Sequence, residues 1–338
     1  MKRTIEIFEK LGKALQKGAP TAILREATEQ NKWFSEQEIN LAIEAIYKTM
    51  LAPEKVEEWM KNYSLRTTQK SEKVLIVMAG NIPLVGFFDL LCTIASGHKA
   101  IIKPSHKDRA LMLWVISLLK EIEPTIPIYI IEERASSDAI DPDIVIATGS
   151  DSTAIHFKNR YKGKKMLLRG SRHSIAILSG KESTEELKAL SRDIYDYSGQ
   201  GCRNISMIFV PRGYDLHKIA PPAEGEEATN QKYRNNYRQN RALLTMNGTT
   251  FHDNGASCLI KSDEFPLRLS SISIVEYDNT SEVEEWAKAH DNEIQCIATN
   301  IAQISSKFAR AVKLGEAQHP TLFDYADGVD TMQFLLQD

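Results

Sequence analysis

The sequence lacks several features that would mark common classes of protein. Among its 338 residues, 42 Lys and Arg stand against 45 Asp and Glu, and a net charge of −3 excludes the basic character of a dedicated nucleic-acid binder. The four cysteines lie far apart without a C-x-x-C pair, so neither a disulfide framework nor a metal centre is expected. A reducing cytoplasm is the expected compartment. No G-x-G-x-x-G occurs, so any dinucleotide is bound without the usual Rossmann fingerprint.

An uninterrupted hydrophobic segment of membrane-spanning length is also lacking. Residues 75–97 carry Asp89 as their single charge, but Gly80, Asn81 and Pro83 interrupt the run. A run broken in this way is typical of a buried strand that turns into a helix. The basic N-terminus has no apolar stretch of signal-peptide length. We therefore expect no membrane insertion.

The chain begins with helical patterns and then alternates strands and helices. Residues 1–72 place their apolar side chains at helical spacing. From residue 73 onward, continuous apolar runs such as "VLIVMA" and "AIIKP" indicate strands covered on both faces. This succession predicts an α/β fold with a doubly wound parallel sheet, which binds ligands at the carboxyl ends of its strands.

The turn "AGNIP" ends the first predicted strand. Gly80 permits a tight turn, and Asn81 offers side-chain donors just before a helix predicted to begin at Pro83. Such donors at a helix N-terminus suit a developing negative charge. Taken alone, an asparagine in this position more often serves as the helix cap.

Two further turns have residues suited to a nucleotide. "KPSHKDR" (103–109) is rich in basic side chains, which could accommodate a ribose 2′-phosphate or could lie on a solvated helix start. In "ATGSD", Gly149 and Ser150 precede a predicted helix, where backbone amides can hold a phosphate.

Cys202 lies in "SGQGCRNIS", among glycines and polar residues where no core could hold it. The glycines let the backbone aim amides at one point, and Arg203 would favour the thiolate. These neighbours predict a nucleophile. Cys92 and Cys296 lie in apolar predicted elements and are expected in the core, while Cys258 is expected in the core or a loop.

Together these segments resemble the signatures of the aldehyde dehydrogenase superfamily, in order and spacing, over residues 73–211. "AGNIP" resembles its asparagine turn, "AIIKPS" its strand at the adenosine ribose, "ATGS" its Gly-Ser turn under the cofactor, and "SGQGC" its nucleophile loop. The resemblance implies that Cys202 forms a thioester and that Asn81 and the Cys202 amide stabilise the oxyanion. The residues that it places at the cofactor are Lys103, Ser105, His106, Gly149 and Ser150.

One departure from that pattern is informative. Oxidising members carry a glutamate that activates water, whereas the corresponding segment here, "LLRGSRH" (167–173), has no carboxylate. The segments "NKWFSEQEI", "SGQGCRN" and "HPTLFDYADGVDTMQFLLQD" are similar to acyl-CoA reductases of the LuxC type. This likeness implies reduction of an acyl-CoA, or a related activated acyl group, to an aldehyde.

The likeness also implies a cofactor. In many NAD-preferring relatives a glutamate directly follows the serine at the ribose, but here that position is His106. Lys107 adds positive charge, which Asp108 partly offsets. We expect NADPH to be preferred, with NADH as the alternative.

The expected architecture is aldehyde dehydrogenase-like. It comprises a helical N-terminal region packed on the cofactor domain (1–72), a dinucleotide-binding domain (73–197), a catalytic α/β domain (198–315) and a C-terminal segment (316–338). An acyl-transferring partner protein and a homo-oligomer are both compatible with it. The alternatives in function are oxidation of free aldehydes, a cysteine acyl-hydrolase or transferase, and a non-catalytic scaffold.

Overall fold

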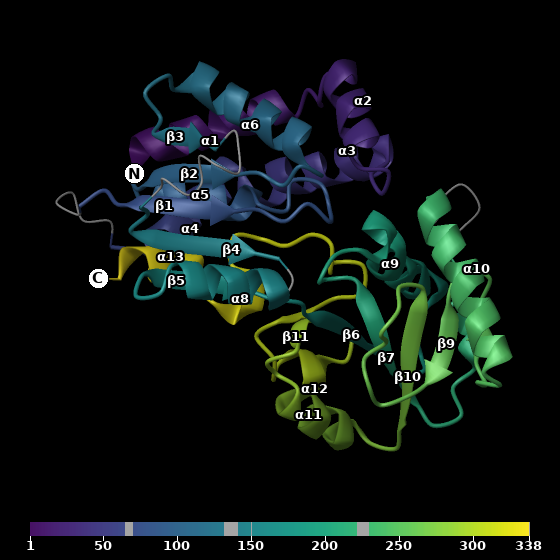
Figure 1. Cartoon of the computed structure of the whole chain (residues 1–338). Helices are drawn as coiled ribbons and strands as arrows, with labels where there is room; N and C mark the ends of the chain where they lie inside the picture. The colour runs from purple at the N-terminus through teal and green to yellow at the C-terminus, as the bar shows by residue number, and fades with distance from the viewer. Residues whose placement is uncertain (65–69, 132–140, 150, 222–229, 338) are drawn as a thin grey trace. The chain divides into compact units, whose positions relative to one another are not determined.

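The computed structural model describes residues 1–64, 70–131, 141–149, 151–221 and 230–337 (Figure 1). The chain forms two compact units, one comprising residues 1–171 and 321–338, the other residues 172–320. The expected boundary at residue 197 differs from this division. The reason is that the strand at residues 173–177 pairs with strands of the second unit.

The N-terminal region of the first unit consists of helices. Their bounds are α1 Lys2–Leu15, α2 Thr21–Gln30, α3 Glu36–Ala45, the π-helical turn Ile46–Met50 and α4 Pro53–Lys61. Helix α3 begins with a capping box, in which the Ser35 hydroxyl and the Glu38 carboxylate each accept from the other's backbone amide. Apolar residues of these helices, among them Phe8, Leu11 and Trp59, are buried in one core with the strands that follow.

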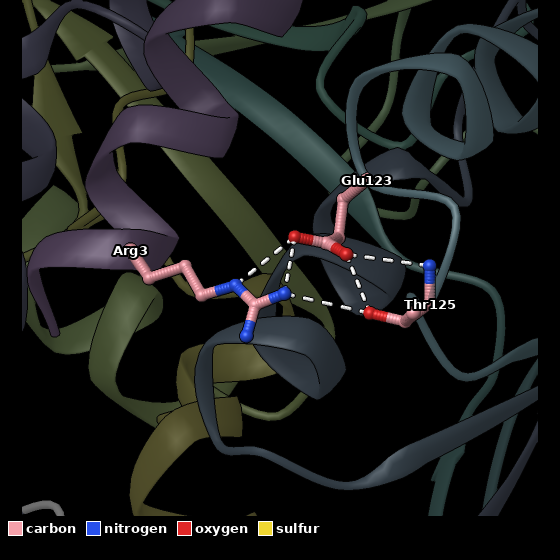
Figure 2. A network of polar contacts seen from close by, with 3 residues as sticks. All are labelled: Arg3, Glu123 and Thr125. Atoms are coloured by element: carbon pink, nitrogen blue, oxygen red, sulfur yellow. Dashed lines mark hydrogen bonds and ion pairs between the residues drawn. The ribbon is translucent and has the colours of Figure 1, made fainter.

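Helix α1 is also tied to the end of α6 (Arg109–Ile122) by a polar contact (Figure 2). The Arg3 guanidinium donates through Nε and Nη2 to Glu123 Oε2, at 3.0 and 2.6 Å. Thr125 donates from its hydroxyl to the other carboxylate oxygen. Because Arg3 is exposed, this contact adds little to stability and mainly fixes how α1 lies on α6.

The first unit is built on a five-stranded parallel sheet in the order β3-β2-β1-β4-β5. The strands are β1 Lys73–Val77, β2 Lys99–Lys103, β3 Ile128–Ile130, β4 Ile144–Thr148 and β5 Lys165–Arg169. Helices α5 (Phe87–Ala95), α6 and α8 (Asp151–Arg160) connect them. The apolar run at residues 75–97 is thus divided between β1 and α5, and the predicted doubly wound sheet is confirmed.

The strand order creates a switch point between β1 and β4. The chain proceeds from β1 to β2 and β3 on one side, and then returns to β4 and β5 on the other. In open parallel sheets, ligands bind where the loops after two such strands diverge. The loops after β1 and β4 are those that contain Asn81 and Gly149.

The second unit holds a seven-stranded sheet in the order β12-β11-β6-β7-β10-β9-β8, parallel except for β8. Its strands are β6 His173–Ile177, β7 Ile205–Pro211, β8 His252–Asp253, β9 Cys258–Lys261, β10 Ser271–Tyr277, β11 Ile294–Thr299 and β12 Ala311–Val312. Its helices are α9 Thr184–Tyr195, α10 Gln231–Met246, α11 Thr280–Ala289 and α12 Ala302–Ser305. Ile175, Met207 and Phe209 lie at the centre of its core.

After the second unit, the chain returns to the first and ends in α13 (Thr331–Leu336). Met332 and Leu335 are fully buried there. His98 Nδ1 accepts from the Glu72 amide, so Nε2 carries the proton that is donated to the Leu335 carbonyl at 3.0 Å. This segment is therefore an integral part of the first unit.

Two surveys of the described residues bear on function. No helix in this part of the chain combines the length and apolar character needed to span a bilayer. The same residues contain no cluster of three or more His, Cys, Asp or Glu side chains suited to a metal ion.

Candidate active site

The loop after β1 is shaped by a close fit at Gly80. A Cβ at this position would lie 2.5 Å from Ser105 Oγ and 2.7 Å from Ser105 Cβ, so the loops after β1 and β2 touch where only glycine fits. Asn31 Nδ2 donates to the Gly80 carbonyl at 3.1 Å, and the Met78 amide donates to the Lys103 carbonyl. Asn81 is half-buried on this tightly held loop.

The helix expected from Pro83 begins at Phe87 instead. Leu84 has a left-handed φ of 57°, which interrupts the helical path, and its amide donates to Asp108 Oδ2 at 2.8 Å. The N-cap residue is Gly86, without a side-chain cap. The interpretation of Asn81 as a helix cap is therefore wrong.

The loop after β2 presents basic side chains outward and one carboxyl group inward. Lys103 and Ser105 are half-buried, the Lys103 ammonium lies 5.5 Å from the Phe157 ring centroid, and His106 and Lys107 are exposed. Asp108 is 3% exposed, and burial raises its pKa well above the usual range. Burial disfavours the ionised form of Asp108, which weakens the expected offset of the Lys107 charge.

The loop after β4 contains Gly149, half-buried, whose amide donates to the Arg169 carbonyl at 3.2 Å. This bond continues the pairing of β4 with β5 and occupies the amide that we expected at a phosphate. Ser150 lies outside the described residues. Gly149 nevertheless lies at the same edge of the sheet as the loops with Asn81 and Ser105, because β1 pairs with both β2 and β4.

The segment "LLRGSRH" begins in β5 and carries a buried arginine. Arg169 Nη1 donates to both carboxylate oxygens of Asp89 at 2.6 Å, and its Nη2 donates to Thr331 Oγ1 at 2.7 Å. Arg169 and Asp89 are 5% and 4% exposed. A carboxylate held in a buried ion pair is poorly suited to activate water, so this pair offers no replacement for the glutamate of oxidising enzymes.

The loop that carries Cys202 begins with an unusual turn. Tyr197, Ser198 and Gly199 adopt left-handed φ values of 55°, 53° and 66°, and the first two are buried. Non-glycine residues rarely adopt this conformation, and it persists where the surroundings enforce it. The turn ends α9 and directs the chain into the segment that contains Cys202.

Asn204 fixes the remainder of this loop. Its Oδ1 accepts from the Gly201 amide at 2.8 Å, and its Nδ2 lies 2.8–3.2 Å from the carbonyls of residues 193, 194 and 196 at the end of α9. Ser174 Oγ of β6 donates to the Cys202 carbonyl at 2.9 Å. The backbone around Cys202 is therefore anchored to both a helix and a strand.

The Cys202 side chain is exposed, whereas Cys92, Cys258 and Cys296 are buried. The core positions expected for Cys92 and Cys296 are confirmed. Arg203 directs Nε to the Ala317 carbonyl, and its Nη2 lies 3.5 Å from Cys296 Sγ. The arginine expected to favour the thiolate thus also ties the loop to β11 and to residue 317.

A comparison with protein-family models decides the family of the chain. Residues 10–220 match the family described as acyl-CoA reductase (LuxC). The chain belongs to this family. A comparison with curated proteins finds no match.

Solved structures place this acyl-CoA reductase family member in the aldehyde dehydrogenase fold. Aldehyde dehydrogenase 21 from Physcomitrella patens, in complex with succinate, matches with a TM-score of 0.68 at 15% identity over 98% of this chain and 83% of that one. An NAD-dependent benzaldehyde dehydrogenase from Corynebacterium glutamicum matches with a TM-score of 0.67 at 15% identity, covering 93% and 81%. An aldehyde dehydrogenase from Bacillus cereus in complex with NAD+ gives 0.64 at 17%, covering 90% and 73%.

The first unit brings most of the expected cofactor residues to one sheet edge. Ser105 touches Gly80, Lys103 is bonded to the loop after β1 through its carbonyl, and Gly149 follows the neighbouring strand. Cys202 belongs to the second unit. The sequence alone did not single out Asn204, which anchors the Cys202 loop in the second unit, or Arg169, which pairs with Asp89 in the first. The sequence signal for Asn204 was an asparagine directly after a glycine-rich loop, and the signal for Arg169 was a charged residue within an apolar predicted strand.

Proposed function

We propose that the chain reduces an acyl-CoA, or a related activated acyl group, to an aldehyde with NADPH, through a thioester at Cys202. The observation that carries this proposal is the exposed Cys202 thiol on a loop anchored by Asn204 and Ser174, in a chain whose other cysteines are buried. Family membership supports the substrate class. The first unit would bind the cofactor, and the second would supply the nucleophile.

Acylation follows from the chemistry of a thiolate. Cys202 attacks the thioester carbonyl carbon, the negative charge moves to the oxygen, and collapse expels the CoA thiolate and leaves the acyl group on Cys202. The Asn81 side chain and the Cys202 amide would stabilise the oxyanion. Rigid anchoring of both loops favours such a role, because preorganised donors need not reorganise during the reaction.

The loops of the first unit fit a dinucleotide. The topological switch point, the half-buried Lys103 and Ser105 and the adjacent His106 provide donors of the kind that bind ribose and phosphate. We assign cofactor contacts to these residues and to Gly149 and Ser150; because the Gly149 amide donates to the Arg169 carbonyl, Gly149 would contact the cofactor through packing and not through that amide. The bound cofactor would supply a hydride for the acyl carbon. Cys202 would then leave as the thiolate when the resulting thiohemiacetal opens to the aldehyde.

Two features favour NADPH and reduction. His106 and Lys107 are exposed, whereas Asp108 is buried and accepts from the Leu84 amide, so residues 106–108 present no exposed carboxylate that would repel a 2′-phosphate. The segment 167–173, which corresponds to the one where oxidising relatives hold their water-activating glutamate, contributes Arg169, and this arginine pairs with the buried Asp89 of α5. Because no carboxylate in this segment is available to activate water, we expect the acyl-cysteine to be reduced and not hydrolysed.

The proposal is tested with CoA thioesters of increasing acyl length, each assayed with NADPH and NADH for release of free CoA and formation of aldehyde. We expect both products in equal amounts for at least one thioester. Release of CoA without aldehyde would support the hydrolase or transferase instead, and oxidation of aldehydes to acids without CoA would support a conventional aldehyde dehydrogenase.

A further inference from the structure

A buried aspartate lies at the end of the helix that leads to Cys202. Asp193, in the last turn of α9, has no exposed surface. Its Oδ2 accepts from the Gly315 amide at 2.6 Å, and its Oδ1 accepts from the Ala317 amide at 3.0 Å. Both carboxylate oxygens are therefore used to hold one short segment of backbone, residues 315–318, which we call the 315–318 turn.

Hydrogen bonds also connect the 315–318 turn to the Cys202 loop. Ala317 is held on both sides, because its amide donates to Asp193 while its carbonyl accepts from Arg203 Nε. Arg203 directly follows Cys202. The Asp193 carbonyl accepts from Gln318 Nε2 at 3.3 Å and from Asn204 Nδ2 at 3.2 Å. A closed set of hydrogen bonds thus links α9, the turn and the loop.

The turn also lies directly on α9. Gly315 has a φ of +91°, and a Cβ at this position would come within 2.8 Å of Ala189 Cβ and 3.6 Å of Arg192 Nη2. Glycine is therefore required both by the backbone conformation and by the close approach. The turn cannot shift far without breaking its bonds to Asp193.

We propose that Asp193 is a positioning residue for Cys202, which holds the 315–318 turn on α9 and, through Ala317 and Arg203, fixes the backbone of the Cys202 loop. This inference rests on the proposed role of Cys202 as the nucleophile. Asp193 itself does not touch the reacting atoms in this account. A carboxylate serves here because it can accept two backbone N–H groups at once.

The holding contact should depend on pH. Burial raises the pKa of Asp193 to about 7, the two backbone hydrogen bonds and Arg203 lower it, and Asp196 raises it. Arg192 Nη2 also lies close to Gly315, Glu316 belongs to the turn itself, and Lys313 precedes it by two residues. Protonation places a hydrogen on one of the two oxygens and weakens one of the two bonds. The turn is therefore held firmly above about pH 7 and loosened below it.

Alkylation of Cys202 by iodoacetamide, followed by peptide mass spectrometry, tests this without cofactor or substrate. Cys202 is the exposed cysteine, so its peptide reports on the loop. The variants are Asp193→Asn, which replaces one acceptor by a donor, and Gly315→Ala, which displaces the turn while leaving every charge in place. The control is Glu284→Gln, a buried carboxylate of α11 that pairs with Lys307.

At about pH 8.5, where Asp193 is ionised, we expect Asp193→Asn and Gly315→Ala to be alkylated severalfold more slowly than wild type. At about pH 5.5 the rates should converge, since protonation loosens the wild-type turn as well. A general loss of stability would not produce this convergence. Glu284→Gln should follow wild type at both values. With substrate, Asp193→Asn should lower kcat by about tenfold to a hundredfold.

Equal alkylation of wild type and both variants at the higher pH, or a rate ratio that is the same at both values, would overturn the inference. If Asp193→Asn does not fold, the alkylation rates of Gly315→Ala at the two pH values decide whether the inference holds. A wild type that forms no aldehyde would refute the proposed function, while the alkylation comparison would still decide whether Asp193 positions Cys202.

Discussion

The two loops that carry the proposed oxyanion donor and the proposed nucleophile are built differently. The loop after β1 follows its strand, and its course is set by the close fit of Gly80 against Ser105 together with hydrogen bonds from Asn31 to the Gly80 carbonyl and from the Leu84 amide to Asp108. The Cys202 loop precedes its strand, β7, and its course is set by a left-handed turn and by hydrogen bonds from side chains to backbone. The first loop has no room for an added atom at Gly80, and this close fit is what distinguishes it from the second loop, which is held by polar partners.

This difference separates two ways in which a protein can fix a functional group. Packing against glycine holds a loop through repulsion and is lost when a side chain is enlarged. Polar anchoring holds a loop through attraction and is lost when a donor or acceptor is removed. Variants of each kind should therefore damage one loop and spare the other.

The largest effect is expected from Asn81→Ala in the loop after β1. Loss of one oxyanion donor should lower kcat by about 10²–10³ while the affinity for NADPH stays nearly unchanged. Steady-state kinetics with a cofactor titration by nicotinamide fluorescence measures both. An effect confined to cofactor affinity would assign Asn81 to the cofactor site alone.

Asn204→Ala should break the polar anchoring of the Cys202 loop. The half-buried Gly201 amide and the carbonyls at the end of α9 lose the Asn204 side chain as a partner, so we expect about 2–3 kcal/mol less stability and slower alkylation of Cys202. Cofactor affinity should remain at the wild-type level. Denaturant unfolding and alkylation rates measure the effect, and Asn204→Asp, which keeps an acceptor for Gly201, should be affected less. Weakened cofactor binding in Asn204→Ala would contradict the separation of the two loops.

Gly80→Ala is the converse test. A methyl group 2.5 Å from Ser105 Oγ forces the loops after β1 and β2 apart, which should cost about 1–3 kcal/mol of stability and weaken NADPH binding. Alkylation of Cys202 in the absence of cofactor should stay unchanged. Thermal unfolding, fluorescence titration and thiol labelling provide the three readouts. Unaltered cofactor binding would show that the fit at Gly80 does not shape the cofactor site.

The smallest effect is expected from His106→Glu, which adds a carboxylate next to Ser105. A charge-assisted contact to a phosphate contributes about 1.5–3 kcal/mol, so wild type should favour NADPH by roughly tenfold or more and the variant should lose that preference. The ratio of kcat/KM for the two cofactors is the measurement. A wild type that uses NADH better, or a ratio that the substitution leaves unchanged, would refute this ribose assignment.

Much of the first loop could be predicted from the sequence because it obeys a general rule of topology. Continuous apolar runs locate β1, β2 and β4, and ligands gather after such strands at a switch point. The start of α5 was predicted too early because nothing in the amino-acid sequence indicates that Leu84 has a positive φ. Asp108 was expected to offset part of the charge of Lys107, and its burial was not foreseen because burial of a carboxyl group depends on tertiary contacts.

The composition of the Cys202 loop revealed it in the sequence, but its backbone conformation and hydrogen bonds could not be predicted. The residues around Cys202 indicate a working thiol, yet Tyr197 and Ser198 give no sign of a left-handed conformation. The bonds of Asn204 join positions up to eleven residues apart, and those of Asp193 join positions more than one hundred apart. Contacts of the second kind arise only when the chain has folded. The two compact units divide at residue 171 and not at the expected residue 197, because the pairing of β6 with β11 is a long-range contact.

The central claim is that Cys202 accepts the acyl group. The most direct test is to mix the protein with an acyl-CoA in the absence of reduced nicotinamide and to weigh the intact chain and its peptides by mass spectrometry. We predict one acyl group per chain, located on Cys202, absent in Cys202→Ala and released as aldehyde when NADPH is added. An acyl group on another residue, or aldehyde formation by Cys202→Ala at a rate close to wild type, would contradict the account.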